Sequence, residues 1–355
     1  MLKSFRAKCL PANMPMMNTT SSTVPIFALI HSNEAETPWK KSFIWLMATN
    51  HPQKNNIKET QAYTVMPNGT ATKPEWLKIR LEKKANFSII KGHREKKGLS
   101  TVCEEAHCPN ITKCWNSGTA TFMVLGSTCT RGCRFCAVNH AIRVEQVDMN
   151  EPENLLNTIK NLKLDYVVIT SVDRDDLPDQ GAGHIAECIS KLKGHGILVE
   201  ALVPDFRGNE GCIRAVVSAK PDVFAHNIET VERLQAEVRD PRANYSQSLS
   251  VLRAAKKSGA RFTKSSIMVG LGEKKDEVLE TMKCLRENKV DFLTVGQYLQ
   301  PSGKHIQLKE YVAPDVFLEY EKAALGMGFL YCASGPLIRS SYRAGDYFRK
   351  VTGNA

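Results

Sequence analysis

Three cysteines within eight residues constrain what this chain can fold into more than any other feature of its sequence. Cys129, Cys133 and Cys136 are spaced C-x3-C-x2-C, and they directly follow residues 121–125, an apolar run that predicts a strand. Three thiolates this close together can hold three corners of an iron–sulfur cube and leave one iron open for another ligand. A zinc site also tolerates short cysteine spacings, although it favours four closed ligands. We therefore expect a metal or cluster loop at the end of a strand.

Short apolar runs rich in β-formers alternate with segments of helical periodicity from about residue 119 onward. Six such β-then-α units predict an α/β fold with a parallel sheet, either doubly wound or curled into an incomplete (β/α) barrel. The helical segments carry apolar faces, for example Ile185, Ile189 and Leu192, or Val278, Met282 and Leu285. The expected strands are residues 121–125, 166–170, 197–203, 223–225, 263–269 and 292–295.

Polar and glycine residues follow several of these strands. In either architecture the chemistry sits at the carboxyl ends of parallel strands, so these residues are candidate contacts for a ligand with amino, carboxylate, ribose and base groups. Each of them taken alone could equally be a helix cap or a turn residue. The candidates are Thr170 and Ser171 after the second strand, Asn227 and Glu229 after the fourth, and Gly270 and Gly272 after the fifth.

A second cysteine triad precedes the first predicted barrel strand. Cys103, Cys108 and Cys114 are spaced C-x4-C-x5-C, and they again supply three thiolates. His107 is the obvious local candidate for a fourth ligand. The chain therefore predicts two separate thiolate sites.

The first triad, placed after strand one of a partial barrel, resembles the radical S-adenosylmethionine enzymes. In that family the open iron binds the amino and carboxylate groups of S-adenosylmethionine, and an electron cleaves this cofactor to a 5′-deoxyadenosyl radical. The second triad and the sequence Arg339-Ser-Ser-Tyr342 narrow the resemblance to the lipoyl synthases. By that resemblance Ser341 is the fourth ligand of an auxiliary cluster, and His107 is not a ligand. The implied fold is an incomplete (β/α)6 TIM-type barrel with N- and C-terminal extensions.

The resemblance covers about residues 73–347, and it implies insertion of two sulfur atoms at C6 and C8 of an octanoyl group on a carrier domain. Neither carbon has an acidic proton, so a general base would be useless and a radical is required. The implied cofactors are S-adenosylmethionine and two [4Fe–4S] clusters. One cluster, at Cys129, Cys133 and Cys136, generates the radical; the other, at Cys103, Cys108, Cys114 and Ser341, donates sulfur.

The implied partners are octanoylated lipoyl-carrier domains, such as the glycine cleavage H protein and the acyltransferase subunits of 2-oxoacid dehydrogenases. A reductant such as ferredoxin or flavodoxin and an iron–sulfur carrier for cluster repair are implied as well, but no nucleic acid and no membrane. Two alternatives stay open. One is another radical enzyme with an auxiliary cluster, biotin-synthase-like or a methylthiotransferase. The other is a zinc-stapled protein that binds nucleic acid.

Positive charge is concentrated near the start of the chain. Residues 1–100 carry 16 Lys+Arg against 6 Asp+Glu, which places +10 of the net charge of +11 there. The basic stretch 73–97 is either a solvated surface or a docking site for an acidic carrier. Four arginines near the strand ends either bind the methionine carboxylate or the carrier, or pair with neighbouring aspartates: Arg239, Arg242, Arg339 and Arg343.

Four segments are expected along the chain: a loosely ordered extension at 1–60, an auxiliary-cluster segment at 61–118, the radical barrel at 119–300 and a C-terminal segment at 301–355. The extension resembles a presequence only in its early basic residues, and Met47 is an alternative start. The segment between the two cysteine triads, which begins at Trp115, resembles the bacterial lipoyl synthases more than the mitochondrial ones. This resemblance predicts a cytoplasmic protein. A mitochondrial location follows if residues 1–46 are a presequence.

Overall fold

The structure is a computed structural model of the 355-residue chain, and it describes residues 63–64, 73–78, 100–105, 108, 110–116 and 119–353. These residues all belong to one compact unit, Ala62–Ala355. The extension expected at residues 1–60 lies outside the described residues, as do His107 and most of the basic stretch 73–97.

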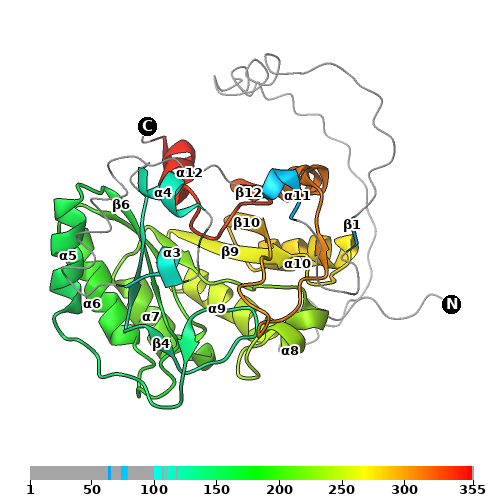
Figure 1. The fold of residues 1–355 in the computed structure, drawn as a ribbon. Helices are drawn as coiled ribbons and strands as arrows, with labels where there is room; N and C mark the ends of the chain where they lie inside the picture. Colours follow the sequence, from blue (N-terminus) through cyan, green and yellow to red (C-terminus); the bar gives the residue numbers. More distant parts are fainter. Residues whose placement is uncertain are drawn as a thin grey trace, which may run out of the picture. The chain divides into compact units, whose positions relative to one another are not determined.

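An eight-stranded sheet forms the centre of this unit (Figure 1). Its order is β12-β10-β9-β8-β7-β6-β3-β2, and every neighbouring pair is parallel except β2 with β3. From β3 to β12 the strands follow one another in chain order, whereas a doubly wound sheet reverses its order at a switch point. Among the described strands, β12 pairs with neither β2 nor β3, so the expected incomplete barrel is confirmed. The strands are β2 (Ser100–Thr101), β3 (Thr121–Val124), β6 (Tyr166–Ser171), β7 (Leu198–Leu202), β8 (Val223–Ala225), β9 (Phe262–Val269), β10 (Phe292–Gln297) and β12 (Tyr331–Gly335).

All six strands expected from the sequence are present within one or two residues of their predicted ends. The parallel strand β12 was not expected, because a five-residue run that ends in Ser-Gly carries little periodic pattern. It pairs in parallel with β10 along five residues, from Phe292 with Tyr331 to Gly296 with Gly335. The C-terminal segment is therefore part of the barrel sheet.

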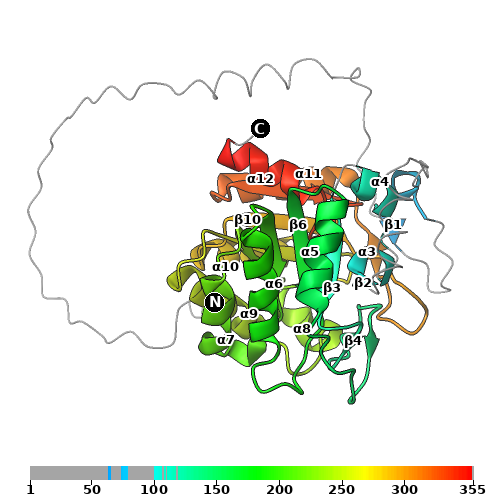
Figure 2. The same ribbon diagram turned by 90° about the vertical axis from the view of Figure 1, so that its left-hand side faces the viewer.

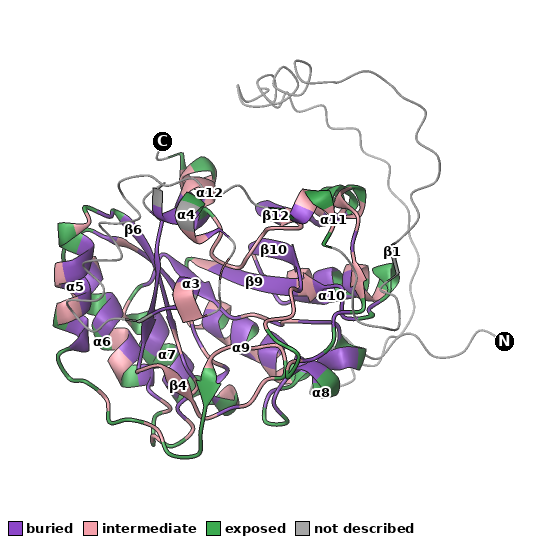
Figure 3. Cartoon of the chain, in the orientation of Figure 1, coloured by how far each residue is buried: buried purple, intermediate pink, exposed green. Residues whose placement is uncertain are grey.

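Helices cover the outer face of the sheet, and each of the six expected strands is followed by at least one of them. The apolar faces expected on α6 and α10 are buried, while the opposite faces of the surrounding helices are exposed (Figure 3). No helix among the described residues is long and apolar enough to cross a membrane. The covering helices are α5 (Glu151–Asn161), α6 (Ala182–Lys193), α7 (Glu210–Ser218), α8 (Gln235–Val238), α9 (Tyr245–Lys257), α10 (Lys275–Glu287) and α11 (Pro314–Gly326). The smaller elements are β1 (Tyr63–Thr64), η1 (Glu75–Leu77), α3 (Val102–Glu105), α4 (Ile111–Asn116), β4 (Thr128–Cys129), β5 (Asn139–His140), η2 (Phe206–Gly208), η3 (Glu232–Leu234), β11 (Glu310–Tyr311) and α12 (Ala344–Thr352).

Aromatic side chains close the barrel at the amino ends of its strands. Phe292 and Tyr331 stack with ring centroids 4.6 Å apart, and Phe348 of α12 lies 5.5 Å from Tyr166. Helix α12 lies across this end of the sheet (Figure 2). One step further along the strands, a buried ion pair joins Lys264 Nζ to Glu200 Oε1 at 2.7 Å. Side chains therefore fill this end of the barrel.

Candidate functional site

A cavity of about 540 Å³ lies at the carboxyl ends of the barrel strands. The cysteine loop after β3 forms one part of its wall, and residues at the ends of β6, β7, β8, β9 and β10 and in the turn after β12 form other parts. The sequence-predicted residues in its wall are Cys129, Cys133, Cys136, Thr170, Ser171, Asn227, Glu229, Arg239 and Arg339.

The three thiols of the loop receive backbone N–H groups, as sulfur ligands of iron clusters commonly do. Cys129 Sγ accepts from the backbone nitrogens of Asp173 at 3.3 Å and Arg131 at 3.4 Å, and Cys133 Sγ accepts from Asp240 at 3.3 Å. Burial nevertheless raises the pKa of Cys129 and Cys133 to about 12 and that of Cys136 to about 11. Bare thiols here would stay protonated at neutral pH, whereas a bound metal deprotonates them outright.

Arg131, inside the cysteine motif, anchors the loop to the barrel. Its guanidinium is almost fully buried and contacts three carboxylates: Asp175 at 2.8 Å, Asp205 at 2.8 Å and Asp173 at 3.3 Å. The pKa of Asp175, which burial would raise, is lowered to about 2 by the hydrogen bonds from Arg131. A second anchor is Asp240, whose Oδ2 accepts the backbone N–H of Gly132 at 2.9 Å. The sequence analysis did not predict a role for Arg131. The only signal in the sequence is its position, a basic residue between Cys129 and Cys133.

The polar residues that follow the second and fourth predicted strands line the cavity, as expected. Ser171 Oγ has no hydrogen-bond partner among the described residues, so a ligand can supply one. Glu229 has φ of 68°, a left-handed conformation that is rare for glutamate and clusters at functional sites. Its backbone is held there by hydrogen bonds with Ser266 at 3.1 Å and Met268 at 2.7 Å. Burial raises the pKa of Glu229, and the charge of Arg239 opposes this.

Gly270 and Gly272 do not line the cavity, in contrast to the other four candidates. A Cβ on Gly270 would lie 2.1 Å from Nε2 of Gln297 and 2.6 Å from the carbonyl oxygen of Glu310. Both glycines also have φ near +100°, which favours glycine whatever surrounds it. Protein packing and a turn therefore explain these glycines, and their placement gives no support to a role in binding adenosine.

A buried hydrogen-bond network includes His226 and Arg239 in the wall of the cavity. Ser248 accepts a hydrogen bond from Arg239 Nη1 at 2.8 Å, and its oxygen lies 2.9 Å from His226 Nε2. His226 Nδ1 lies 2.9 Å from the carbonyl oxygen of Val203, so this nitrogen carries the proton of a neutral ring. Burial, followed by the charge of Arg239, lowers the pKa of His226 to about 4. The imidazole therefore stays neutral and positions Arg239 through the serine.

The second triad gathers around Ser341, which lies more than two hundred residues away in the chain. Cys103, Cys108, Cys114 and Ser341 line one small pocket, and Thr121 Oγ1 donates to Ser341 Oγ at 2.9 Å. Burial, followed by the charge of Cys108, raises the pKa of Cys103 to about 11 and that of Cys114 to about 12. These thiols, like those of the first loop, need a cation to become thiolates.

The four arginines divide into two kinds. Arg242 pairs with Asp240 at 2.8 Å and Arg343 pairs with Asp346 at 2.6 Å, which is the alternative that the sequence left open. Arg239 and Arg339 line the main cavity, and Arg339 also lines the small pocket.

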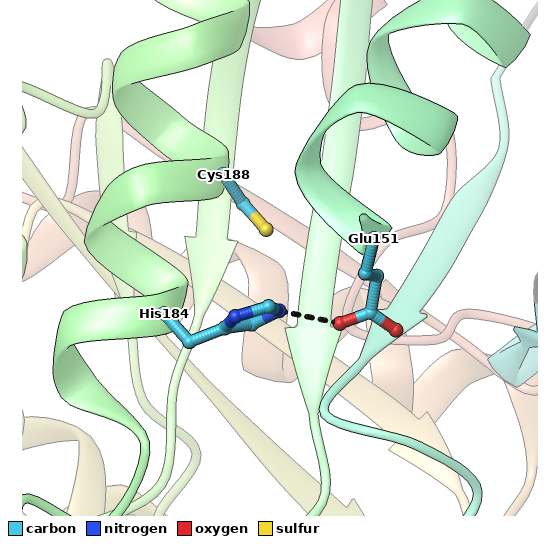
Figure 4. Close-up of side chains that lie close together, drawn as sticks. All are labelled: Glu151, His184 and Cys188. Carbon is cyan, nitrogen blue, oxygen red and sulfur yellow. Dashed lines mark hydrogen bonds and ion pairs between the residues drawn. The ribbon is translucent and has the colours of Figure 1, made fainter. Parts of the chain in front are cut away.

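Outside these two sites, one further group in the described part of the chain combines possible metal ligands (Figure 4). His184 and Cys188 project from α6 toward Glu151 of α5, and His184 Nε2 lies 2.7 Å from Glu151 Oε2. The same oxygen accepts the backbone N–H of Leu125 at 2.8 Å. We interpret the pair as a structural link between α5, α6 and the end of β3, because these hydrogen bonds already account for it.

The sequence of this chain is similar to those of known proteins. The model of the radical SAM superfamily matches residues 123–285. The chain is 53% identical to the lipoyl synthase of Picrophilus torridus, over 77% of this chain and 95% of that protein, and 52% identical to the mitochondrial lipoyl synthase of Drosophila melanogaster, over 78% and 75%. Among solved structures, the FeFe-hydrogenase maturase from Carboxydothermus hydrogenoformans is 14% identical with a TM-score of 0.49, over 66% of this chain and 56% of that one.

Proposed function

Because this chain belongs to the lipoyl synthase family, we propose that it inserts two sulfur atoms, at C6 and C8 of an octanoyl group attached to a carrier protein. One observation carries the proposal: two separate cysteine sites share a wall. The first triad opens on the main cavity, and the second adjoins it through Arg339, which lines both.

The donor sets of both sites suit iron–sulfur clusters. We propose that Cys129, Cys133 and Cys136 hold a [4Fe–4S] cluster whose open iron binds S-adenosylmethionine. The second [4Fe–4S] cluster would be held by Cys103, Cys108, Cys114 and Ser341. When bound, these groups supply the electron that cleaves S-adenosylmethionine and the sulfur that is transferred.

The chain's own residues bind, orient and exclude water. Thr170, Ser171, Asn227 and Glu229 are our candidates for the polar groups of S-adenosylmethionine, since they lie in the same wall as the first triad. Asp173 and Asp240 present backbone N–H groups to the thiolates and so favour the charged form. The octanoyl chain needs apolar surroundings without water, and apolar side chains of the cavity offer them: Met123, Leu202, Met268 and Ile338.

The proposed partners follow from this chemistry. The substrates are octanoylated carrier domains, of the glycine cleavage H protein or of 2-oxoacid dehydrogenase acyltransferases. A ferredoxin or flavodoxin would supply electrons, and an iron–sulfur carrier would rebuild the donor cluster after each product. Docking of an acidic carrier on the basic stretch 73–97 stays a prediction; of that stretch, Lys73 lines the main cavity and Lys78 pairs with Glu75.

The relatives include mitochondrial, bacterial and archaeal proteins. We keep the cytoplasm as the proposed location, with mitochondria as the alternative if residues 1–46 are a presequence. N-terminal sequencing of the native protein would decide between them, since a start well inside the chain that does not coincide with Met47 would indicate a cleaved presequence.

The decisive experiment is anaerobic purification followed by turnover on an octanoylated carrier domain with S-adenosylmethionine and a reductant. We expect about eight iron and eight sulfide per chain, lipoylated carrier as the product, and loss of turnover when either triad is changed to alanine. A biotin-synthase-like enzyme or a methylthiotransferase would leave the octanoyl group unchanged. Colourless protein with stoichiometric zinc after reconstitution would refute the proposal and favour the zinc-stapled alternative.

A further inference from the structure

Arg339 lies in the wall between the main cavity and the auxiliary pocket, because its side chain lines both. It belongs to the turn that follows β12 and brings Ser341 to the thiols. Two backbone carbonyls hold its guanidinium: Nη1 donates to Ile338 at 2.7 Å and to Gln297 at 3.2 Å. The turn packs closely on β10, where a Cβ on Gly296 would lie 3.6 Å from Arg339 Nη1.

The charge of Arg339 is uncompensated within the described part of the chain. No carboxylate there forms an ion pair with it, whereas Arg343 of the same turn pairs with Asp346 at 2.6 Å. Its hydrogen bonds within the described residues involve only Nη1, which leaves the N–H groups of Nε and Nη2 without a protein acceptor there. Arg339 is partly buried, and an anionic partner stabilises a partly buried cation.

The auxiliary pocket is where such a partner would bind. Arg339 lines this pocket together with the three thiols and Ser341. A cluster held by three thiolates and a serine oxygen is an anion. Hydrogen bonds to its sulfur atoms and nearby positive charge raise its reduction potential.

We infer that the positive charge of Arg339 and its N–H groups at Nε and Nη2 act on the anionic cluster of the auxiliary site. The inference rests on the proposed function, since it requires a cluster at Cys103, Cys108, Cys114 and Ser341. Arg339 makes that cluster easier to reduce, and it stands between the sulfur donor and the substrate cavity.

The test uses the full chain with Cys129, Cys133 and Cys136 changed to alanine, so that only the auxiliary cluster is present. In this background, redox titration followed by EPR compares Arg339→Gln and Arg339→Lys with the unchanged turn. We expect Arg339→Gln to lower the equilibrium constant for cluster reduction at least tenfold, about 59 mV for one electron. Arg339→Lys keeps the charge and should change it less. Arg343→Gln is the matched control, because that exposed arginine already has a partner, and it should change the constant less than threefold.

A second measurement leaves Arg339 in place and so does not depend on how its variants fold. In the same background labelled with ¹⁵N-arginine, pulsed EPR of the reduced cluster should show a ¹⁵N coupling that Arg343→Gln retains. Absence of the coupling, or a constant in folded Arg339→Gln equal to that of the control, would overturn the role of Arg339 and leave the proposed function standing. A background chain that binds no cluster would refute both.

Discussion

Gly296 is where the turn carrying Ser341 rests on the sheet, so enlarging this residue tests how the auxiliary site is assembled. A Cβ on Gly296 would lie 2.2 Å from the carbonyl oxygen of Ile338. Real Cβ atoms essentially never come within 3.0 Å, so the carbonyl would have to recede by at least 0.8 Å. Strand β10 is paired on both sides, with β9 and with β12, and cannot yield. The turn must move instead, and overpacking of this kind costs about 1–3 kcal/mol.

We therefore expect Gly296→Ala to displace Ser341 from the thiols of the second triad while the first triad stays intact. The second cluster is then held by three thiolates alone, so total iron should fall below about eight per chain, by at most about four, and turnover on the octanoylated carrier should be lost. Iron and sulfide quantitation alongside the turnover assay measures both effects. Gly303→Ala is the control, because its added Cβ meets nothing within 4 Å. A Gly296→Ala protein with full iron content and wild-type turnover would refute the reasoning.

Three further predictions concern stability and turnover. Arg131→Met leaves three carboxylates without their shared cation, so it should destabilise the chain by about 3–5 kcal/mol in thermal or denaturant unfolding. The control is Arg207→Gln, which removes an exposed ion pair and should cost at most about 1 kcal/mol. Equal effects of the two substitutions would contradict the anchoring role of Arg131. His226 stays neutral in the fold to about pH 4, while the unfolded chain binds its proton below about pH 6.5, so acidification between these values should cost the wild type about 3 kcal/mol more than His226→Gln. If the free energy of unfolding falls with pH by the same amount in both proteins, this histidine does not titrate as described. Ser341→Cys should retain the auxiliary cluster but slow turnover, because a fourth thiolate holds iron more firmly than a serine oxygen does; unchanged turnover would argue against a labile serine ligand.

Arg339 is a residue whose contacts could not be predicted from the sequence. Its neighbours in the chain made an ion pair as plausible as a ligand contact, and for Arg343 of the same turn the ion pair is what forms. The difference lies in what faces each side chain: Asp346 lies three residues beyond Arg343, whereas Arg339 faces two cavities. No pattern of local spacing carries that information.

Features that depend on neighbours in the chain could be predicted from the sequence. Both cysteine triads, the six barrel strands and the buried faces of α6 and α10 follow from local spacing and periodicity, because a period of two or 3.6 residues already selects the face that packs inward. Ser341 was matched to the second triad only through the resemblance to the lipoyl synthases, and the structure brings the two together. The position of Arg339 between two cavities, and the packing of Gly270 against Gln297 rather than a ligand, come from the tertiary structure. These encounters depend on how β12 and the turn after it pack on β10, and packing between segments far apart in the chain leaves no periodic mark in either of them.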